Sequence, residues 1–190
     1  MKVDKVVAGL LAGAVGAQLM RLGIPGRYRP LYEAAGARHG VDPNMLHAIA
    51  LWEARGSENA TAVSPQNNNG SRDYGLMQIS SSNFAWLGVT ATSVMDPATN
   101  VDCAARILKG ARDLAPHLNV LDEFSVYNGG FSQHRDPQGR RRPKLTPEGV
   151  YINVPYVVGA ASWYALIAIA DLAPIKRLGW PVAPTPGGTG

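Results

Sequence analysis

Cysteine is almost missing from this chain, which has one such residue, Cys103, among 190. A single cysteine excludes an internal disulfide framework and any zinc site built on paired cysteines. We expect Cys103 to be a small buried residue on an apolar helix face rather than a nucleophile. The four histidines stand far apart, without the spacing of metal ligands, so the sequence indicates no metal and no other cofactor.

Charged and aromatic residues are also sparse, at 17% and 7% of the chain. The 46% of apolar residues nevertheless excludes wholesale disorder, and a chain of this length can bury one core without covalent cross-links. The net charge of +4 is too small to indicate nucleic-acid binding, and much of the excess comes from residues 135–144. No phosphate-binding glycine motif is visible, which excludes the common nucleotide-binding classes.

The N-terminal apolar run is too short for a comfortable membrane span. Residues 6–20 carry no charge, and as a helix they would measure about 22 Å against a hydrocarbon core of about 30 Å. Lys2 and Lys5 precede the run, and Val15-Gly16-Ala17 offers a signal-peptide cleavage site. Gly9, Gly13 and Gly16 would also let such a helix pack closely against another one. Residues 1–24 are therefore interpreted as a signal peptide or as a membrane-active helix that serves delivery; an ordinary buried helix is the third reading.

The middle of the chain, residues 28–172, reads as a single mainly α domain. Asp42-Pro43 and Asp96-Pro97 both combine an N-cap residue with proline at the first helical position. Ser80–Ser82 can cap a short helix. Apolar periodicity predicts longer helices over 29–39, 43–55, 97–114, 121–127 and 155–173, with Leu114 buried and the last helix central. A small irregular or β region is expected around residues 60–80, with a loop or a small irregular hairpin at Asn69 and Gly70. Residues 173–190 are rich in proline and glycine and indicate an extended tail.

Glu53 is the first candidate for chemistry, because it interrupts an apolar stretch near the end of the second predicted helix. It is either a solvated residue, an ion-pair partner of Arg55, or a partly desolvated acid. Desolvation would raise its pKa into the range that suits general acid catalysis.

Two later segments combine polar and aromatic residues that can hold a ligand. Residues 73–78 bring together an acid, a tyrosine, a glycine and an amide, and Gly75 would let the backbone approach a ligand closely. Gln78 can contact a ligand or satisfy the backbone of its own loop. Residues 127–130 offer a tyrosine and an amide where a helix ends, although Asn and Gly are also ordinary C-cap residues.

Together these segments resemble the soluble lytic transglycosylase (SLT) domain of the lysozyme-like superfamily. The resemblance covers residues 28–170 and rests on Glu53, Gly75-Leu76-Met77-Gln78, Tyr127-Asn128-Gly129-Gly130, Tyr156-Val157 and Tyr164. It implies a lysozyme-like α+β fold that cleaves peptidoglycan between N-acetylmuramic acid and N-acetylglucosamine. The stretch 67–79 looks most like the branch that accompanies type IV secretion systems and bacteriophage virions.

The resemblance also implies roles for individual residues. Glu53 would act as acid and then as base, so that the muramic acid closes on itself as a 1,6-anhydro sugar. The residues implied in substrate binding are Tyr74, Met77, Gln78, Tyr127, Asn128 and Tyr156. Ala54 stands where the family usually has serine, and Asp73 resembles the second carboxylate of animal-type lysozymes. Hydrolysis by Glu53 with Asp73 is therefore the alternative reaction.

The same resemblance implies the partners and the location. The substrate would be the glycan strands of peptidoglycan, and the enzyme would be exported to the cell envelope or periplasm, or delivered there by a virion. A secretion apparatus or a phage ejection complex, and a membrane touched by residues 1–24, are further expected partners. Residues 140–144 are interpreted as a solvated loop, with contact to an anionic wall polymer or to packaged nucleic acid as the alternative. The non-enzymatic alternative is a structural conduit protein, but such a protein would not need an acid at Glu53.

Overall fold

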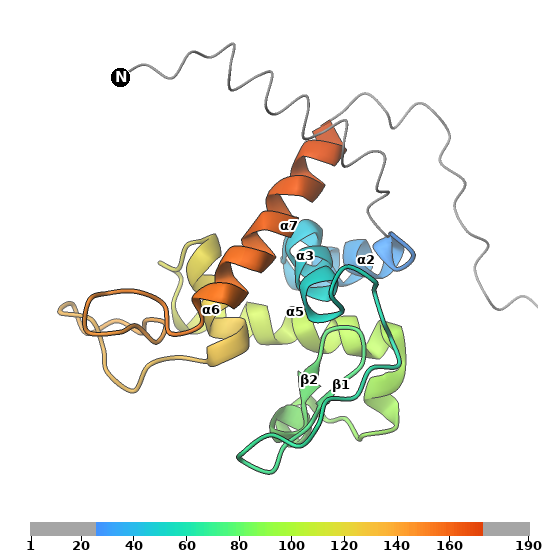
Figure 1. Ribbon diagram of the computed structural model, residues 1–190, viewed down its shortest axis with the longest axis horizontal. Helices are drawn as coiled ribbons and strands as arrows, with labels where there is room; N and C mark the ends of the chain where they lie inside the picture. Colours follow the sequence, from blue (N-terminus) through green and yellow to red (C-terminus); the bar gives the residue numbers. More distant parts are fainter. Residues whose placement is uncertain (1–25, 173–190) are drawn as a thin grey trace, which may run out of the picture.

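The computed structural model describes residues 26–172, which form a mainly helical fold with one small sheet (Figure 1). Within these residues lie the α-helices α2 (Arg29–His39), α3 (Pro43–Glu53), α4 (Phe84–Leu87), α5 (Pro97–Leu114), α6 (Val120–Gly129) and α7 (Val154–Leu172). The antiparallel strands β1 (Asp73–Tyr74) and β2 (Ile79–Ser80) and the 3-10 turns η1 (Ser81–Asn83) and η2 (Ser93–Met95) complete the order. The expected mainly α class is confirmed. The N-terminal segment and the tail considered above lie outside the described residues.

The two Asp-Pro signals begin helices as predicted. The Asp42 carboxylate accepts a hydrogen bond from the Asn44 amide at 2.9 Å, and Asp96 accepts one from the Thr99 amide at 2.9 Å. Each bond satisfies a backbone donor that a helix start leaves free. The start of α3 is thereby fixed, and its last residue is Glu53.

The core is built around α3, whose seven consecutive residues from Met45 to Leu51 are all buried. Helices α2 and α7 form its most extensive contacts, and α2 also packs on α5. A Cβ atom added at Gly159 of α7 would lie 2.0 Å from the Trp52 ring, so this glycine is what lets α7 approach α3 so closely. The helix at the centre of the fold is thus α3.

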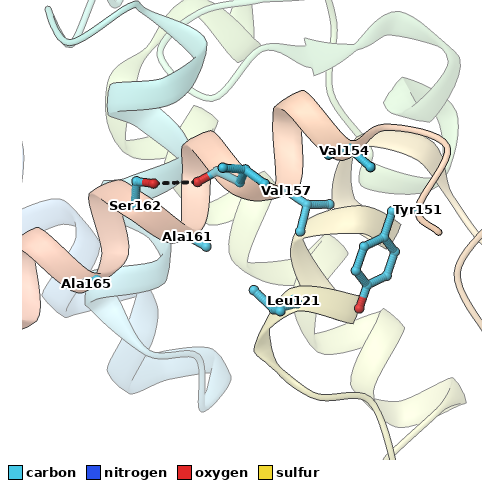
Figure 2. A pocket seen from close by; sticks show the side chains of 8 residues that line it. Leu121, Tyr151, Val154, Val157, Ala161, Ser162 and Ala165 are labelled. Atoms are coloured by element: carbon cyan, nitrogen blue, oxygen red, sulfur yellow. Dashed lines mark hydrogen bonds between the residues drawn. The ribbon is translucent and has the colours of Figure 1, made fainter. Parts of the chain in front are cut away.

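Helix α7, predicted to be central, lies instead on the outside and projects past the other helices in Figure 1. The stretch Val154–Asp171 is long and apolar enough to cross a membrane by length and composition, and 22% of it is buried. Its outer face forms a shallow apolar pocket with Leu121 and Tyr151, whose side chains face Val154 and Val157 in Figure 2. The central position was wrong because a uniformly apolar sequence does not say which face of a helix is covered.

The small irregular hairpin at Asn69 and Gly70 is observed: Val63 pairs with Tyr74 in an isolated antiparallel bridge, and the Asn67 amide donates to the Ser71 carbonyl inside the turn. The strands β1 and β2 form a second hairpin around Gly75–Gln78. Two further local expectations need correction. The turn η1 precedes α4, and no serine side chain caps that helix. Leu114 was expected inside and is 57% exposed, because it is the last residue of α5 and lies on the rim of a cleft.

A buried amide joins the sheet region to α5. Asn100 is fully buried, and its side-chain oxygen accepts the Met77 amide at 2.7 Å. Its side-chain nitrogen donates to the carbonyls of Tyr74 at 2.9 Å and Val94 at 2.8 Å. A Cβ atom at Gly75 would come within 2.5 Å of this amide, which explains a glycine at that point. The turn between β1 and β2 is therefore held by one side chain from a distant helix.

Replacing Asn100 by alanine should destabilise the fold by about 2–4 kcal/mol, because three buried backbone groups would lose their partner. Urea denaturation of parent and variant measures the change. Asn59→Ala is the matched control, since Asn59 is exposed and bonds only to nearby Thr61. If Asn100→Ala lowers the free energy of unfolding by less than about 1 kcal/mol, the turn between β1 and β2 does not depend on the Asn100 side chain.

Candidate active site

A cleft of about 960 Å³ separates the sheet region from the ends of α3 and α6, with α5 as its floor. Loop 67–71, the sheet and α4 contribute one wall, and the segment from Val126 to Phe131 contributes the other. The residues predicted for the site that line this cleft are Glu53, Asp73, Gln78, Tyr127 and Asn128. Residues from four separate stretches of sequence thus meet around one hollow.

Glu53 is the half-buried acid of the cleft. Burial raises its pKa to about 7, the nearby Tyr156 hydroxyl opposes the rise, and the negative charge of Asp73 adds to it. Arg55 is exposed and forms no ion pair with Glu53 in the described part of the chain. Of the three readings open at the sequence level, the structure favours the desolvated acid, which can carry a proton at neutral pH.

Two phenol groups stand next to this carboxyl. Tyr156 is buried and packs its ring edge-on against Trp52. Its hydroxyl faces the Glu53 carboxyl but forms no well-formed hydrogen bond within the described residues. The Tyr127 hydroxyl donates to the Met77 carbonyl at 2.8 Å. Burial, followed by the charge of Glu53, raises the pKa of both tyrosines well above the ordinary value. Both hydroxyls therefore stay protonated and act as donors.

Gln78 and Asp73 are held by their own loops. The Gln78 backbone has a φ of 48°, and its amide nitrogen donates to the Gly75 carbonyl at 2.8 Å. The alternative that this amide satisfies its own loop is thus observed, and it still lines the cleft. The Asp73 carboxylate accepts a hydrogen bond from the Asn67 amide at 3.2 Å. Both side chains are oriented before any ligand arrives.

Three residues named from the sequence do not line the cleft. Tyr74 packs its ring against Phe84 with centroids 5.3 Å apart, and the Met77 side chain is fully buried in the core. Tyr156 lies behind Glu53. The structure places these residues where they support the cleft, and Met77 does so through its backbone carbonyl on Tyr127.

The sequence reasoning also missed residues. Asn153 donates to the Asn128 side-chain oxygen at 2.9 Å and accepts the Ser125 hydroxyl at 2.8 Å, so it orients an amide of the cleft. Trp86 lines the cleft and is 53% exposed. A lone exposed tryptophan in a polar segment was a usable signal, whereas nothing in the sequence links Asn153 to Asn128.

The chain matches the Transglycosylase SLT domain family over residues 30–148, more than half of its length. Protein IpgF of Shigella flexneri is 35% identical over 124 residues, which cover 63% of this chain and 76% of that protein. The endo-type membrane-bound lytic murein transglycosylase A of Salmonella paratyphi B is 29% identical over 121 residues, 59% of this chain and 49% of that protein. The match to the latter thus spans about half of its length.

Replacing Glu53 by glutamine should stabilise the fold at alkaline pH and change it little at pH 4. The carboxyl titrates at about 7 in the folded chain, against an ordinary value of 4.5. Between these values the folded state keeps a proton that the unfolded state releases, so the stability of the parent falls as pH rises. The full shift corresponds to about 3 kcal/mol.

Urea denaturation between pH 4 and pH 8 measures the difference between parent and variant. A difference in unfolding free energy that stays constant over this range would mean that Glu53 is solvated in the folded chain.

Proposed function

Because the chain belongs to the Transglycosylase SLT domain family, we propose that it acts as a peptidoglycan lytic transglycosylase and that Glu53 is its catalytic acid and base. The observation that carries this assignment is a carboxyl in the large cleft whose pKa is raised by burial to about 7. Such an acid is protonated often enough at neutral pH to give a proton, and basic enough to take one back.

The proposed reaction breaks the β-1,4 bond between N-acetylmuramic acid and N-acetylglucosamine. Neutral Glu53 gives its proton to the glycosidic oxygen, the bond from that oxygen to C1 breaks, and positive charge develops on the muramic ring. The Glu53 carboxylate then removes the proton from the C6 hydroxyl, whose oxygen bonds to C1. The products are a 1,6-anhydro muramic end and a free N-acetylglucosamine hydroxyl, and no water is consumed.

Neighbouring groups support each half of this cycle. The hydroxyl of Tyr156 faces the carboxyl and favours its charged form once the proton has left. Asn128, oriented by Asn153, and Gln78 present amides to the cleft, and amides suit the hydroxyl and acetamido groups of the sugars. Tyr127 adds an aromatic surface.

Hydrolysis by the same cleft is the second candidate, and the position of Asp73 favours it. Asp73 lines the cleft with Glu53, and its negative charge contributes to the raised pKa of that acid. In our proposal Asp73 stabilises the positive charge at C1 and forms no bond to it, because the substrate supplies its own nucleophile. The bond between Asn67 and the Asp73 carboxylate suits a fixed electrostatic role.

We also propose that the enzyme works at the cell envelope, where its substrate is. Transglycosylase A of Salmonella paratyphi B is a membrane-bound murein enzyme, and residues 6–20 of this chain form an apolar run. Opening of the wall for a secretion apparatus or for phage genome entry, from the periplasmic side, would fit such a location.

Glu53→Gln should reduce cleavage of purified peptidoglycan at least a hundredfold, whereas Asp73→Asn should reduce it far less. The first change removes the proton donor, and the second only weakens an electrostatic contact. Mass spectrometry of the released muropeptides measures both the rate and the product, since an anhydro end is lighter by one water.

Thermal unfolding of both variants serves as the control for folding. Activity of Glu53→Gln within tenfold of the parent would refute the catalytic assignment. Equal losses in the two variants, with reducing-end products, would show a hydrolytic pair.

Tyr156→Phe should shift the alkaline limb of the kcat/KM profile to higher pH by up to about one unit. The hydroxyl lowers the pKa of Glu53, so its removal raises that pKa further and keeps the acid protonated longer. Initial rates between pH 5 and pH 9 give the profile.

Tyr164→Phe is the matched control on the same helix, because Tyr164 bonds to Asp42 at 2.6 Å and does not line the cleft. Its profile should coincide with that of the parent. Identical alkaline limbs for Tyr156→Phe and the parent would mean that the phenol does not act on Glu53.

A further inference from the structure

A basic segment follows directly on one wall of the cleft, and the proposed reaction does not use it. Residues 131–144, here called the basic rim, contain five arginine and lysine residues and one acid, Asp136. The rim begins at Phe131, which lines the cleft together with Gly130. In Figure 1 it belongs to the long loop between α6 and α7.

The rim folds back on itself and so holds Arg141 and Arg142 beside Phe131, the rim residue that lines the cleft. Phe131 pairs with Pro143 in an isolated antiparallel bridge, and the Ser132 amide donates to the Arg142 carbonyl at 2.9 Å. The Arg141 guanidinium lies over the Phe131 ring, 5.7 Å from its centroid. Arg141 and Arg142 are both half-buried, so they are partly ordered next to the cleft before any ligand binds.

The charge of the rim is not balanced by its own acid. Asp136 pairs with Arg140 at 2.7 Å and accepts the backbone amides of Gln138 and Arg140, which uses it to hold the tip of the loop. The other four cations form no ion pair with any described residue: Arg135, Arg141, Arg142 and Lys144. The Arg142 Nε atom is shielded from solvent and lacks a hydrogen-bond partner among the residues described. These groups are ready for an anion.

We propose that the basic rim binds the carboxylates of the peptide stems attached to the glycan strand. The inference rests on the proposed function, which places a glycan strand in the cleft. The sugars of such a strand are neutral once their lactyl groups are bonded to peptide, so the anionic groups are the stem carboxylates next to them. A planar guanidinium matches a carboxylate with two parallel hydrogen bonds. The rim thus selects strands whose stems are present and charged.

The energetic weight of this contact comes from Arg141 and Arg142 rather than from the exposed cations. Fully solvated ion pairs contribute little, whereas half-buried guanidinium groups with an unfilled donor gain more from a charged acceptor. Contact with the stem should therefore change binding of the substrate and leave the chemistry at Glu53 unaltered. In kinetic terms, it lowers KM and leaves kcat unchanged.

The test measures binding without turnover, using Glu53→Gln as the common background. Soluble peptide-bearing glycan strands are compared with the same strands after amidation of their stem carboxylates, which keeps the peptide and removes its charge. Tryptophan fluorescence reports binding, since Trp86 lines the cleft. We expect about tenfold tighter binding of the charged strands. Adding Arg141→Gln and Arg142→Gln should abolish this preference and leave affinity for amidated strands unchanged.

Arg38→Gln is the control for loss of a positive charge outside the basic rim, because Arg38 lies on α2 and pairs with Asp102. Arg38→Gln should keep the full preference for charged strands. The double lysine variant, Arg141→Lys with Arg142→Lys, should keep part of it. If the double glutamine variant melts early, Arg141→Gln alone tests the same contact and should weaken the preference. Higher salt should also reduce it.

A preference that survives loss of both arginines overturns the inference, and so does an equal loss of affinity for charged and amidated strands. Absence of any binding overturns it as well. Failure of the proposed function has a separate signature, since the parent would then release no anhydro muropeptides from purified wall, whatever the binding preference.

Discussion

The close contact between α3 and α7 is the interaction on which the site depends. Trp52 of α3 lies against Gly159 of α7, where even a methyl group would meet the ring at 2.0 Å. This contact places Tyr156 edge-on against Trp52 and covers the end of α3, so that Glu53 loses water on one side and faces the cleft on the other. The raised pKa of Glu53 is therefore a consequence of helix packing, and any change that separates the two helices acts on the acid as well.

A second buried group holds the chain immediately after Glu53. Glu58 is buried with a φ of 50°, and its carboxylate accepts the Tyr32 hydroxyl at 2.8 Å and the Arg27 amide at 2.9 Å. His47 of α3 lies 3.5 Å from the same carboxylate. Burial raises the pKa of Glu58, while these hydrogen bonds oppose the rise. The segment that leaves the end of α3 is thus tied back to α2 and α3, which limits how far Glu53 can move.

Local features were predictable from the sequence, and contacts between distant segments were not. Asp42-Pro43 and Asp96-Pro97 fixed two helix starts because capping involves only neighbouring residues. Glu53 stood out as a carboxyl in an apolar stretch. The roles of Asn100 and Asn153 depend on bonds to residues 23 and 25 positions away, which no periodicity records. For the same reason, the apolar pattern of α7 predicted a helix but misplaced it at the centre.

The apolar composition of α7 and its contacts next to Glu53 favour different surroundings for this helix. By composition the helix could cross a membrane, and 22% of its apolar stretch is buried. Yet Tyr156, near its start, faces Glu53, and Gly159 packs on Trp52, outside the residues matched to the family. Withdrawal of α7 into a bilayer would uncover Trp52 and return Glu53 to water, and the pKa of that acid would fall toward 4.5. The proposed role of Glu53 as an acid at neutral pH therefore requires α7 to stay on α3, and only the outer face of α7, with the pocket of Figure 2, is free to meet an apolar surface.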